Sequence, residues 1–90
     1  MSKQNQEPLT IKVRFFAAAR EHTGVSTIDI PVKRSTCLGQ LRTIISNQYP
    51  EIKPLLPYLR WAVNTHFSTD DELVLNSGDE VALIPPISGG

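Results

Sequence analysis

The last two residues of the sequence have the type and position to do chemistry. The chain ends on Gly89-Gly90, and because glycine has no Cβ, such an end can thread a narrow channel and present an unhindered carboxylate. Two prolines favour an extended start to this segment, which can reach roughly 20 Å. A frayed chain end is the alternative. We expect a tail that enters a partner's active site, with the Gly90 carboxylate as its reactive group; its residues are Pro85, Pro86, Ile87, Ser88, Gly89 and Gly90.

Size and charge favour a carrier whose partners are proteins. Ninety residues make one small domain with little room for a deep catalytic cavity. Nine basic and nine acidic residues cancel without forming runs of one sign, which argues against a nucleic-acid or anionic-membrane surface. No stretch approaches the roughly 20 apolar residues that span a bilayer, and the polar start is no signal peptide. The lone Cys37 agrees with a reducing compartment. We expect a cytoplasmic protein that binds neither nucleic acid nor membrane.

The first half of the chain reads as a hairpin followed by a helix. Apolar residues alternate with a period of two over residues 9–16 and again over 25–32, which predicts two strands joined by a short connection at 17–24. Ser35 or Thr36 can cap the helix that follows, and a proline at position 50 ends it.

The second half reads as strands separated by turns. The proline-broken stretch 50–57 is a poor candidate for a second helix. A strand is expected at 59–64 and a short one at 72–75. The turn Asn76-Ser77-Gly78-Asp79 then leads into a last strand at 80–84.

This order of elements predicts an α+β domain of the β-grasp, or ubiquitin-like, class. Four to five strands would form a mixed sheet wrapped on one main helix. Ferredoxin-like folds stay in play on pattern alone, although they require a second helix. We expect residues 1–8 to be a disordered N-terminal segment, residues 9–84 to form the domain, and residues 85–90 to be a flexible, extended tail.

Two apolar residues fall in the wrong strand phase for the core, and a third lies in a turn. Phe16 lies on the polar face of the first strand, Ile84 in the outer phase of the last, and Phe67 in the turn after Asn64. If the first and last strands pair, Phe16 and Ile84 form an exposed apolar patch that leads into the tail, which indicates an interface, and Phe67 is a third candidate for it. Packing under the loops is the alternative. Arg20 could pair with a partner's carboxylate or be an ordinary surface arginine.

The other residues that could take part in chemistry give little indication of a reactive or metal-binding site. His22 and His66 have no cluster of ligands at metal-binding spacing, so no metal site is expected. Cys37 lies near a helix start that could make its thiol reactive, yet small half-buried cysteines are commoner. Trp61 and Tyr58 are expected to pack against the core. No glycine-rich phosphate loop is present, so ATP would be bound by a partner.

The sequence resembles the MoaD-type small subunit of molybdopterin synthase from about residue 9 to residue 90. The most specific features are the Phe-Phe-Ala-x-x-Arg-Glu run and the Pro-Pro-x-Ser-Gly-Gly tail in one short chain. The matching residues are Ile11-Lys12-Val13-Arg14-Phe15-Phe16-Ala17 with Arg20, Glu21 and Gly24, then Ala62-Val63-Asn64, Gly78-Asp79-Glu80-Val81-Ala82 and Pro85-Pro86-Ile87-Ser88-Gly89-Gly90.

The resemblance implies a sulfur carrier that is not an enzyme on its own. An adenylating enzyme related to ubiquitin activators would use ATP and magnesium to place AMP transiently on Gly90, and a sulfur donor would then leave a thiocarboxylate. The tail would enter the large catalytic subunit and give sulfur to cyclic pyranopterin monophosphate, forming molybdopterin. The family assembles as a heterotetramer of two small and two large subunits, and the small subunit holds no permanent cofactor.

Two alternatives share the fold and the activation step. One is a sulfur carrier for thiamine synthesis or tRNA thiolation, although the Phe-Phe-Ala opening argues against the thiamine type. The other is a ubiquitin-like modifier that joins Gly90 to lysines of target proteins. Because both sulfur carriage and conjugation begin at an activated terminal glycine, the tail does not separate them.

Overall fold

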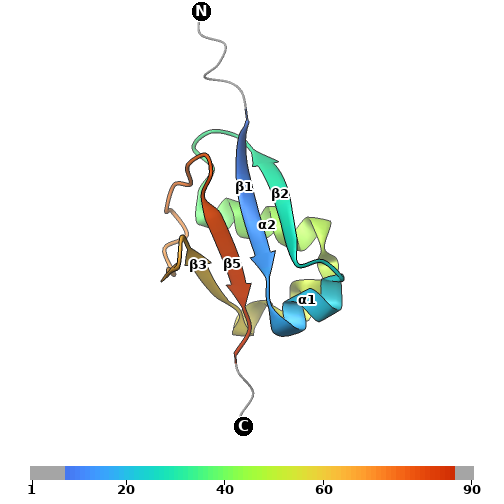
Figure 1. The fold of residues 1–90 in the computed structure, drawn as a ribbon. Coiled ribbons are helices and arrows are strands. Elements are labelled where there is room, and N and C mark those ends of the chain that lie inside the picture. The colour runs from blue at the N-terminus through green and yellow to red at the C-terminus, as the bar shows by residue number, and fades with distance from the viewer. Residues whose placement is uncertain (1–7, 87–90) are drawn as a thin grey trace, which may run out of the picture.

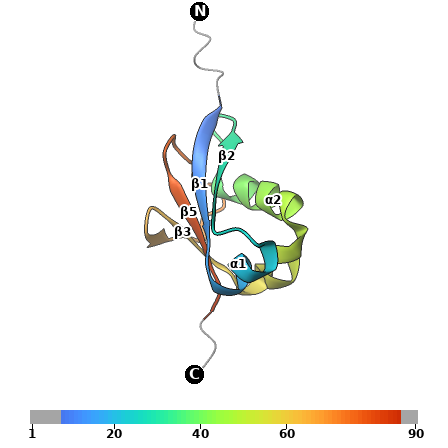
Figure 2. The same ribbon diagram turned by 45° about the vertical axis from the view of Figure 1, so that its right-hand side comes forward.

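The computed structural model describes residues 8–86, which form a five-stranded mixed sheet with helices on one face (Figures 1 and 2). The strand order is β2-β1-β5-β3-β4, in which β1 and β5 are parallel and the other neighbours antiparallel. The predicted β-grasp arrangement is therefore confirmed. Its elements are β1 (Leu9–Phe15), α1 (Ala17–Thr23), β2 (Thr27–Val32), α2 (Leu38–Gln48), the 3-10 helix η2 (Pro50–Tyr58), β3 (Arg60–Val63), β4 (His66–Phe67) and β5 (Glu80–Ile84).

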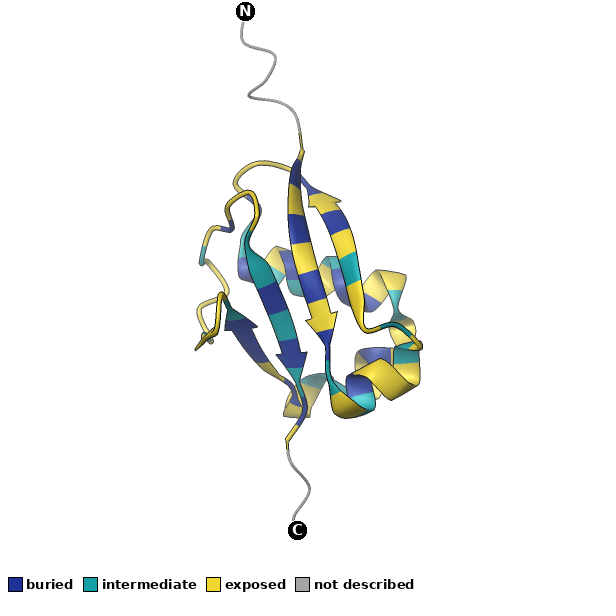
Figure 3. Cartoon of the chain, in the orientation of Figure 1, coloured by how far each residue is buried: buried dark blue, intermediate teal, exposed yellow. Residues whose placement is uncertain are grey.

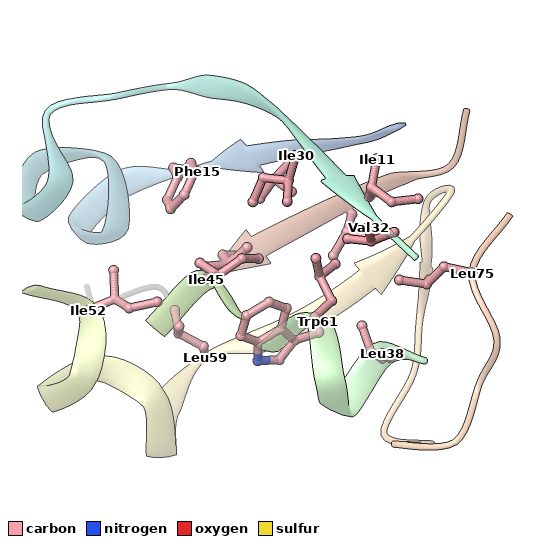
Figure 4. Packing of buried hydrophobic residues seen from close by; sticks show 14 of the residues in the cluster. Ile11, Phe15, Ile30, Val32, Leu38, Ile45, Ile52, Leu59, Trp61 and Leu75 are labelled. Carbon is pink, nitrogen blue, oxygen red and sulfur yellow. The ribbon is translucent and has the colours of Figure 1, made fainter. Parts of the chain in front are cut away.

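The core lies between the sheet and α2, as the alternation of buried and exposed residues along β1 shows (Figure 3). The inward residues of β1 and β5 meet the apolar side of α2, and Trp61 of β3 packs beside them (Figure 4). Each fully buried aliphatic side chain contributes about 1.5–3 kcal/mol. The side chains that are almost completely buried are Ile11, Val13, Phe15, Leu38, Leu41, Ile45, Ile52, Leu75, Val81 and Leu83.

Residues 17–24 form a helix, so the prediction of a plain connection there is wrong. α1 spans Ala17–Thr23, its Ala19 is fully buried, and Gly24 ends it in the left-handed conformation at φ 78°. The Gly24 N–H donates to the Arg20 carbonyl at 2.8 Å, which satisfies one of the free carbonyls of the last turn. The alanine run followed by glycine is the local signal for this short helix.

The proline-broken stretch is helical as well, in the tighter 3-10 form. η2 runs from Pro50 to Tyr58, contains Pro54 and Pro57, and buries Ile52. Proline fixes φ near −65°, which suits a 3-10 helix as well as an α-helix. The expectation of no second helix is therefore wrong.

The N-cap of α2 is Cys37, one residue after Thr36 and two after Ser35, the two predicted caps. Ser35 has a left-handed φ of 70° and belongs to the preceding turn. The carbonyl of Thr36 accepts the Leu75 N–H at 2.9 Å, which holds the chain extended at this point. The Cys37 N–H instead donates to Oε1 of Gln40 at 3.0 Å, closing a capping box.

Residues 72–75 form only an isolated bridge between Cys37 and Val74, so the predicted short strand is wrong. The start of α2 takes the backbone groups of this loop: the Leu38 N–H donates to the Leu73 carbonyl at 2.8 Å and the Gly39 N–H to the Asp71 carbonyl at 2.9 Å. A Cβ on Gly39 would lie 3.0 Å from that of Asp71, so glycine permits this close approach.

β3 and β4 form a hairpin that also fixes β5. Asn64 and Thr65 have φ of 50° and 73°, as tight hairpin turns require, and Phe67 lies in β4 rather than in the turn. The Asn64 side chain donates to Oδ1 of Asp79 and accepts the Glu80 N–H, both at 2.9 Å. These bonds hold the start of β5 beside the end of β3.

Candidate functional site

β5 carries the chain to the predicted tail. It lies between β1 and β3 and ends at Ile84, at the end of the sheet where α1 lies (Figure 1). Pro85 is buried and Pro86, the last described residue, is exposed. The other predicted tail residues, Ile87, Ser88, Gly89 and Gly90, lie outside the described part of the chain. The predicted tail thus begins at the end of a strand that is hydrogen-bonded to a neighbour on each side.

The three apolar residues predicted to be exposed lie on the side of the sheet away from the helices, and we call them the docking patch: Phe16, Ile84 and Phe67. Phe16 follows β1 directly, and its N–H donates to the Leu83 carbonyl at 3.3 Å, which puts it beside Ile84. Ile84 pairs with Arg60 of β3, and Phe67 pairs with Ala62 on the same strand. Phe67 is 54% exposed, whereas Phe16 and Ile84 are half-buried.

Two arginines that the sequence analysis overlooked lie over the rings of the patch. The guanidinium carbon of Arg14 lies 5.1 Å from the Phe16 ring centroid, and that of Arg60 lies 3.9 Å from the Phe67 centroid. Arg14 also pairs with Glu80 at 3.1 Å, a surface contact of little energetic weight. The patch is therefore apolar with a cationic rim. Outward strand phase is the signal for Arg14, but the position of Arg60 depends on the register of β3.

Arg20 is an exposed residue of α1, the helix that lies at the end of the sheet where β5 finishes (Figure 1). It is therefore near the base of the predicted tail rather than beside Phe67. A guanidinium there can meet a carboxylate of a protein that takes up the tail.

The remaining polar candidates make local contacts. Nδ1 of His22 lies 2.9 Å from the Ala18 carbonyl oxygen, and Nδ1 of His66 lies 3.0 Å from that of Asn64. The Cys37 thiol is half-buried, and its sulfur lies 3.4 Å from Oε1 of the Gln40 side chain within the helix cap. Across residues 8–86, no group of three or more histidine, cysteine or acidic side chains could hold a metal ion.

Of the two aromatic residues that were expected to pack against the core, only one is buried. Trp61 is buried, as predicted, but Tyr58 is 64% exposed at the end of η2. The prediction for Tyr58 is wrong because the 3-10 helix turns this residue outward before β3 begins.

Within the described residues, none of the helices has the length and apolar character needed to cross a membrane.

Comparison with known proteins gives a consistent result. The sequence profile of the ThiS family matches residues 13–90. A Dictyostelium discoideum protein named molybdopterin synthase sulfur carrier subunit is 38% identical over 82 residues, which cover 88% of this chain and 94% of that protein.

Solved structures agree with the fold. SAMP1 from Haloferax volcanii superposes with a TM-score of 0.81 at 21% identity, covering 90% of this chain and 99% of that one. A chain of the complex of subunits 1 and 2 of the molybdopterin-converting factor from Helicobacter pylori superposes with a TM-score of 0.70 at 27% identity, covering 91% and 100%. The first shows the β-grasp fold alone, and the second comes from a two-subunit assembly.

Proposed function

This chain belongs to the ThiS family and is a sulfur carrier subunit for molybdopterin synthase, and we propose that it carries sulfur as a thiocarboxylate on Gly90. The observation that carries the proposal is the extent of the family match, which runs through the whole of β5 and on to the last glycine. The fixed position of β5 between β1 and β3 supports it, because a held strand defines where the tail begins.

Activation must come from a partner, because a carboxylate is a poor acyl donor. An oxygen of the Gly90 carboxylate attacks the α-phosphorus of ATP, and pyrophosphate leaves. Hydrosulfide released by a sulfur donor then attacks the acyl carbon, and AMP leaves with the C–O electron pair. Loss of the S–H proton gives the thiocarboxylate. We assign ATP and magnesium to an adenylating enzyme related to ubiquitin activators, with AMP only transiently bound to Gly90.

Transfer to the pterin follows in the large subunit. The tail, residues 85–90, brings the thiocarboxylate to cyclic pyranopterin monophosphate. In each transfer the sulfur bonds to a pterin carbon, and water then cleaves the acyl C–S bond and restores the Gly90 carboxylate. Two such transfers supply the dithiolene sulfurs of molybdopterin. The carrier contributes positioning, since a tethered nucleophile has a high effective concentration at its target. The catalytic pocket belongs to the large subunit, which is therefore the enzyme. We expect a heterotetramer of two small and two large subunits.

We propose that both partners, the adenylating enzyme and the large subunit, bind to the docking patch. A partner that covers Phe16, Ile84 and Phe67 lies against the sheet at the place where β5 delivers the tail, while Arg20 can pair with an acid beside the tail's base. Because the same patch and tail serve activation and transfer, the two partners bind in turn. We also place these steps in the cytosol, where the single Cys37 stays reduced.

Capture of bound partners tests this function. The protein, tagged at its N-terminus so that Gly90 stays free, is expected to retain a large synthase subunit in a complex of two copies of each chain. Mass spectrometry and light scattering of the eluted complex are the readouts. Recovery of lysine-linked adducts of Gly90 on many proteins, without a synthase subunit, would contradict the proposal and favour a protein modifier.

A further inference from the structure

A cleft opens beside β3 at the β4 edge of the sheet, next to the docking patch. Its volume is about 400 Å³. Its lining comes from α2, η2, β3, β4 and the residues that follow β4. The side chains that give the cleft its character are Arg42, Arg60, Trp61, Phe67, Ser68 and Thr69.

Aromatic stacking holds the two arginines of this cleft in place. The guanidinium carbon of Arg60 lies 3.9 Å from the Phe67 ring centroid, and that of Arg42 lies 5.4 Å from the Trp61 centroid. A stacked guanidinium keeps its N–H groups free in the plane of the fork, where they match a carboxylate. The cleft thus presents oriented donors on aromatic supports.

The charges of these two arginines are not equally balanced. Nη2 of Arg42 lies 2.7 Å from Oδ1 of Asp71, which offsets its charge. Within residues 8–86, Arg60 has no carboxylate at ion-pair distance. The hydroxyl groups of Ser68 and Thr69 add further donors to the lining. The missing component is therefore an anion that faces Arg60.

The cleft is continuous with the docking patch. Arg60 lies directly opposite Ile84 across β3 and β5, and its guanidinium covers Phe67. A protein that buries Ile84 and Phe67 must also cover Arg60. Such a protein would desolvate the guanidinium, which is costly unless the partner supplies an opposite charge.

We propose that this cleft is the outer part of the docking surface and receives an aspartate or glutamate side chain of the large synthase subunit, bound by the Arg60 fork. This inference rests on the proposed function, because it takes the large subunit as the partner on the patch. It adds an element of recognition: the apolar patch provides area, while the Arg60–carboxylate pair fixes the register of the complex and selects the partner.

The test is the affinity of the full-length protein for the purified large subunit. Arg60→Glu is expected to raise the Kd about 30-fold or more, because it places two carboxylates together, and Arg60→Gln about 10-fold. Arg34→Glu is the matched control: it makes the same charge change at an exposed residue outside the cleft and is expected to stay within about twofold of wild type. A Kd for Arg60→Glu equal to that of the control would overturn the proposal.

Two further measurements distinguish loss of an ion pair at Arg60 from a folding defect in the variants. Wild-type affinity is expected to fall more steeply with salt than that of Arg60→Gln, since only the former has the ion pair to screen. The melting temperature of each variant shows that the fold is intact. Saturable binding of inorganic phosphate at the cleft in NMR titrations, with the Kd for the large subunit unchanged by Arg60→Glu, would reassign the cleft to a small anion. Wild-type protein that is never thiocarboxylated would refute the proposed function itself, independently of Arg60.

Discussion

Removal of Gly90 is expected to abolish sulfur transfer while the domain stays folded. The deletion takes away the carboxylate on which the acyl-adenylate and thiocarboxylate form. One residue added after Gly90 should have the same effect, because it moves the carboxylate by roughly 3.5 Å, and misplacement by about 1 Å can already cost 100-fold in rate. The measurement is molybdopterin formed in a reconstituted reaction, with circular dichroism as the check on folding.

The opposite end of the chain provides the control for this deletion. A variant that lacks residues 2–7, which precede the family match, should form molybdopterin at the wild-type rate. Activity retained without Gly90, or with an extra residue after it, would remove the terminal glycine from the role we give it. Loss of the circular dichroism spectrum of the folded domain would instead mean that the change acts through the fold.

Substitution of Phe67 by alanine is the second change with a large expected effect. The ring is 54% exposed and its stacking on Arg60 is a surface contact, so its loss should alter the free energy of unfolding by only about 1 kcal/mol. In the complex the same ring would be buried in the interface, where loss of an aromatic anchor costs about 2 kcal/mol, or roughly 30-fold in Kd. Titration calorimetry against the large subunit measures this change.

Tyr58 is the matched control for Phe67. It is also an exposed aromatic residue, at 64%, but it lies on η2 outside the patch. Tyr58→Ala should leave the Kd within about twofold of wild type. Equal losses from Tyr58→Ala and Phe67→Ala, or none from Phe67→Ala, would show that the partner does not settle on the patch.

Local patterns predicted the parts of the fold that depend on strand phase and on one helical stripe. β1 shows this best, because every second residue from Leu9 to Phe15 is buried, as its alternation predicts. The wrong secondary-structure predictions are for segments whose conformation depends on contacts with distant parts of the chain. Residues 72–75 read as a strand, yet the start of α2 takes their backbone hydrogen bonds. The proline-rich stretch reads as a break, yet it closes over the core through Ile52.

The residues of the candidate site likewise include some that the sequence predicts and one that it does not. Phe16 and Ile84 could be picked out from the sequence because each violates the phase of its own strand. Arg60 could not, because its significance comes from the register that places it opposite Ile84 and over Phe67. Such contacts join residues from separate strands, and no local pattern in the sequence contains them.

The intact mass of the protein after incubation with ATP, magnesium, an adenylating enzyme and a sulfur donor tests the central claim most directly. We predict a gain of about 16 Da, the replacement of one carboxylate oxygen by sulfur, confined by fragmentation to Gly90. The gain should disappear as molybdopterin forms when the large subunit and the pterin precursor are added. An unchanged mass, or a thiocarboxylate that persists in the presence of the large subunit and the pterin precursor, would contradict the account.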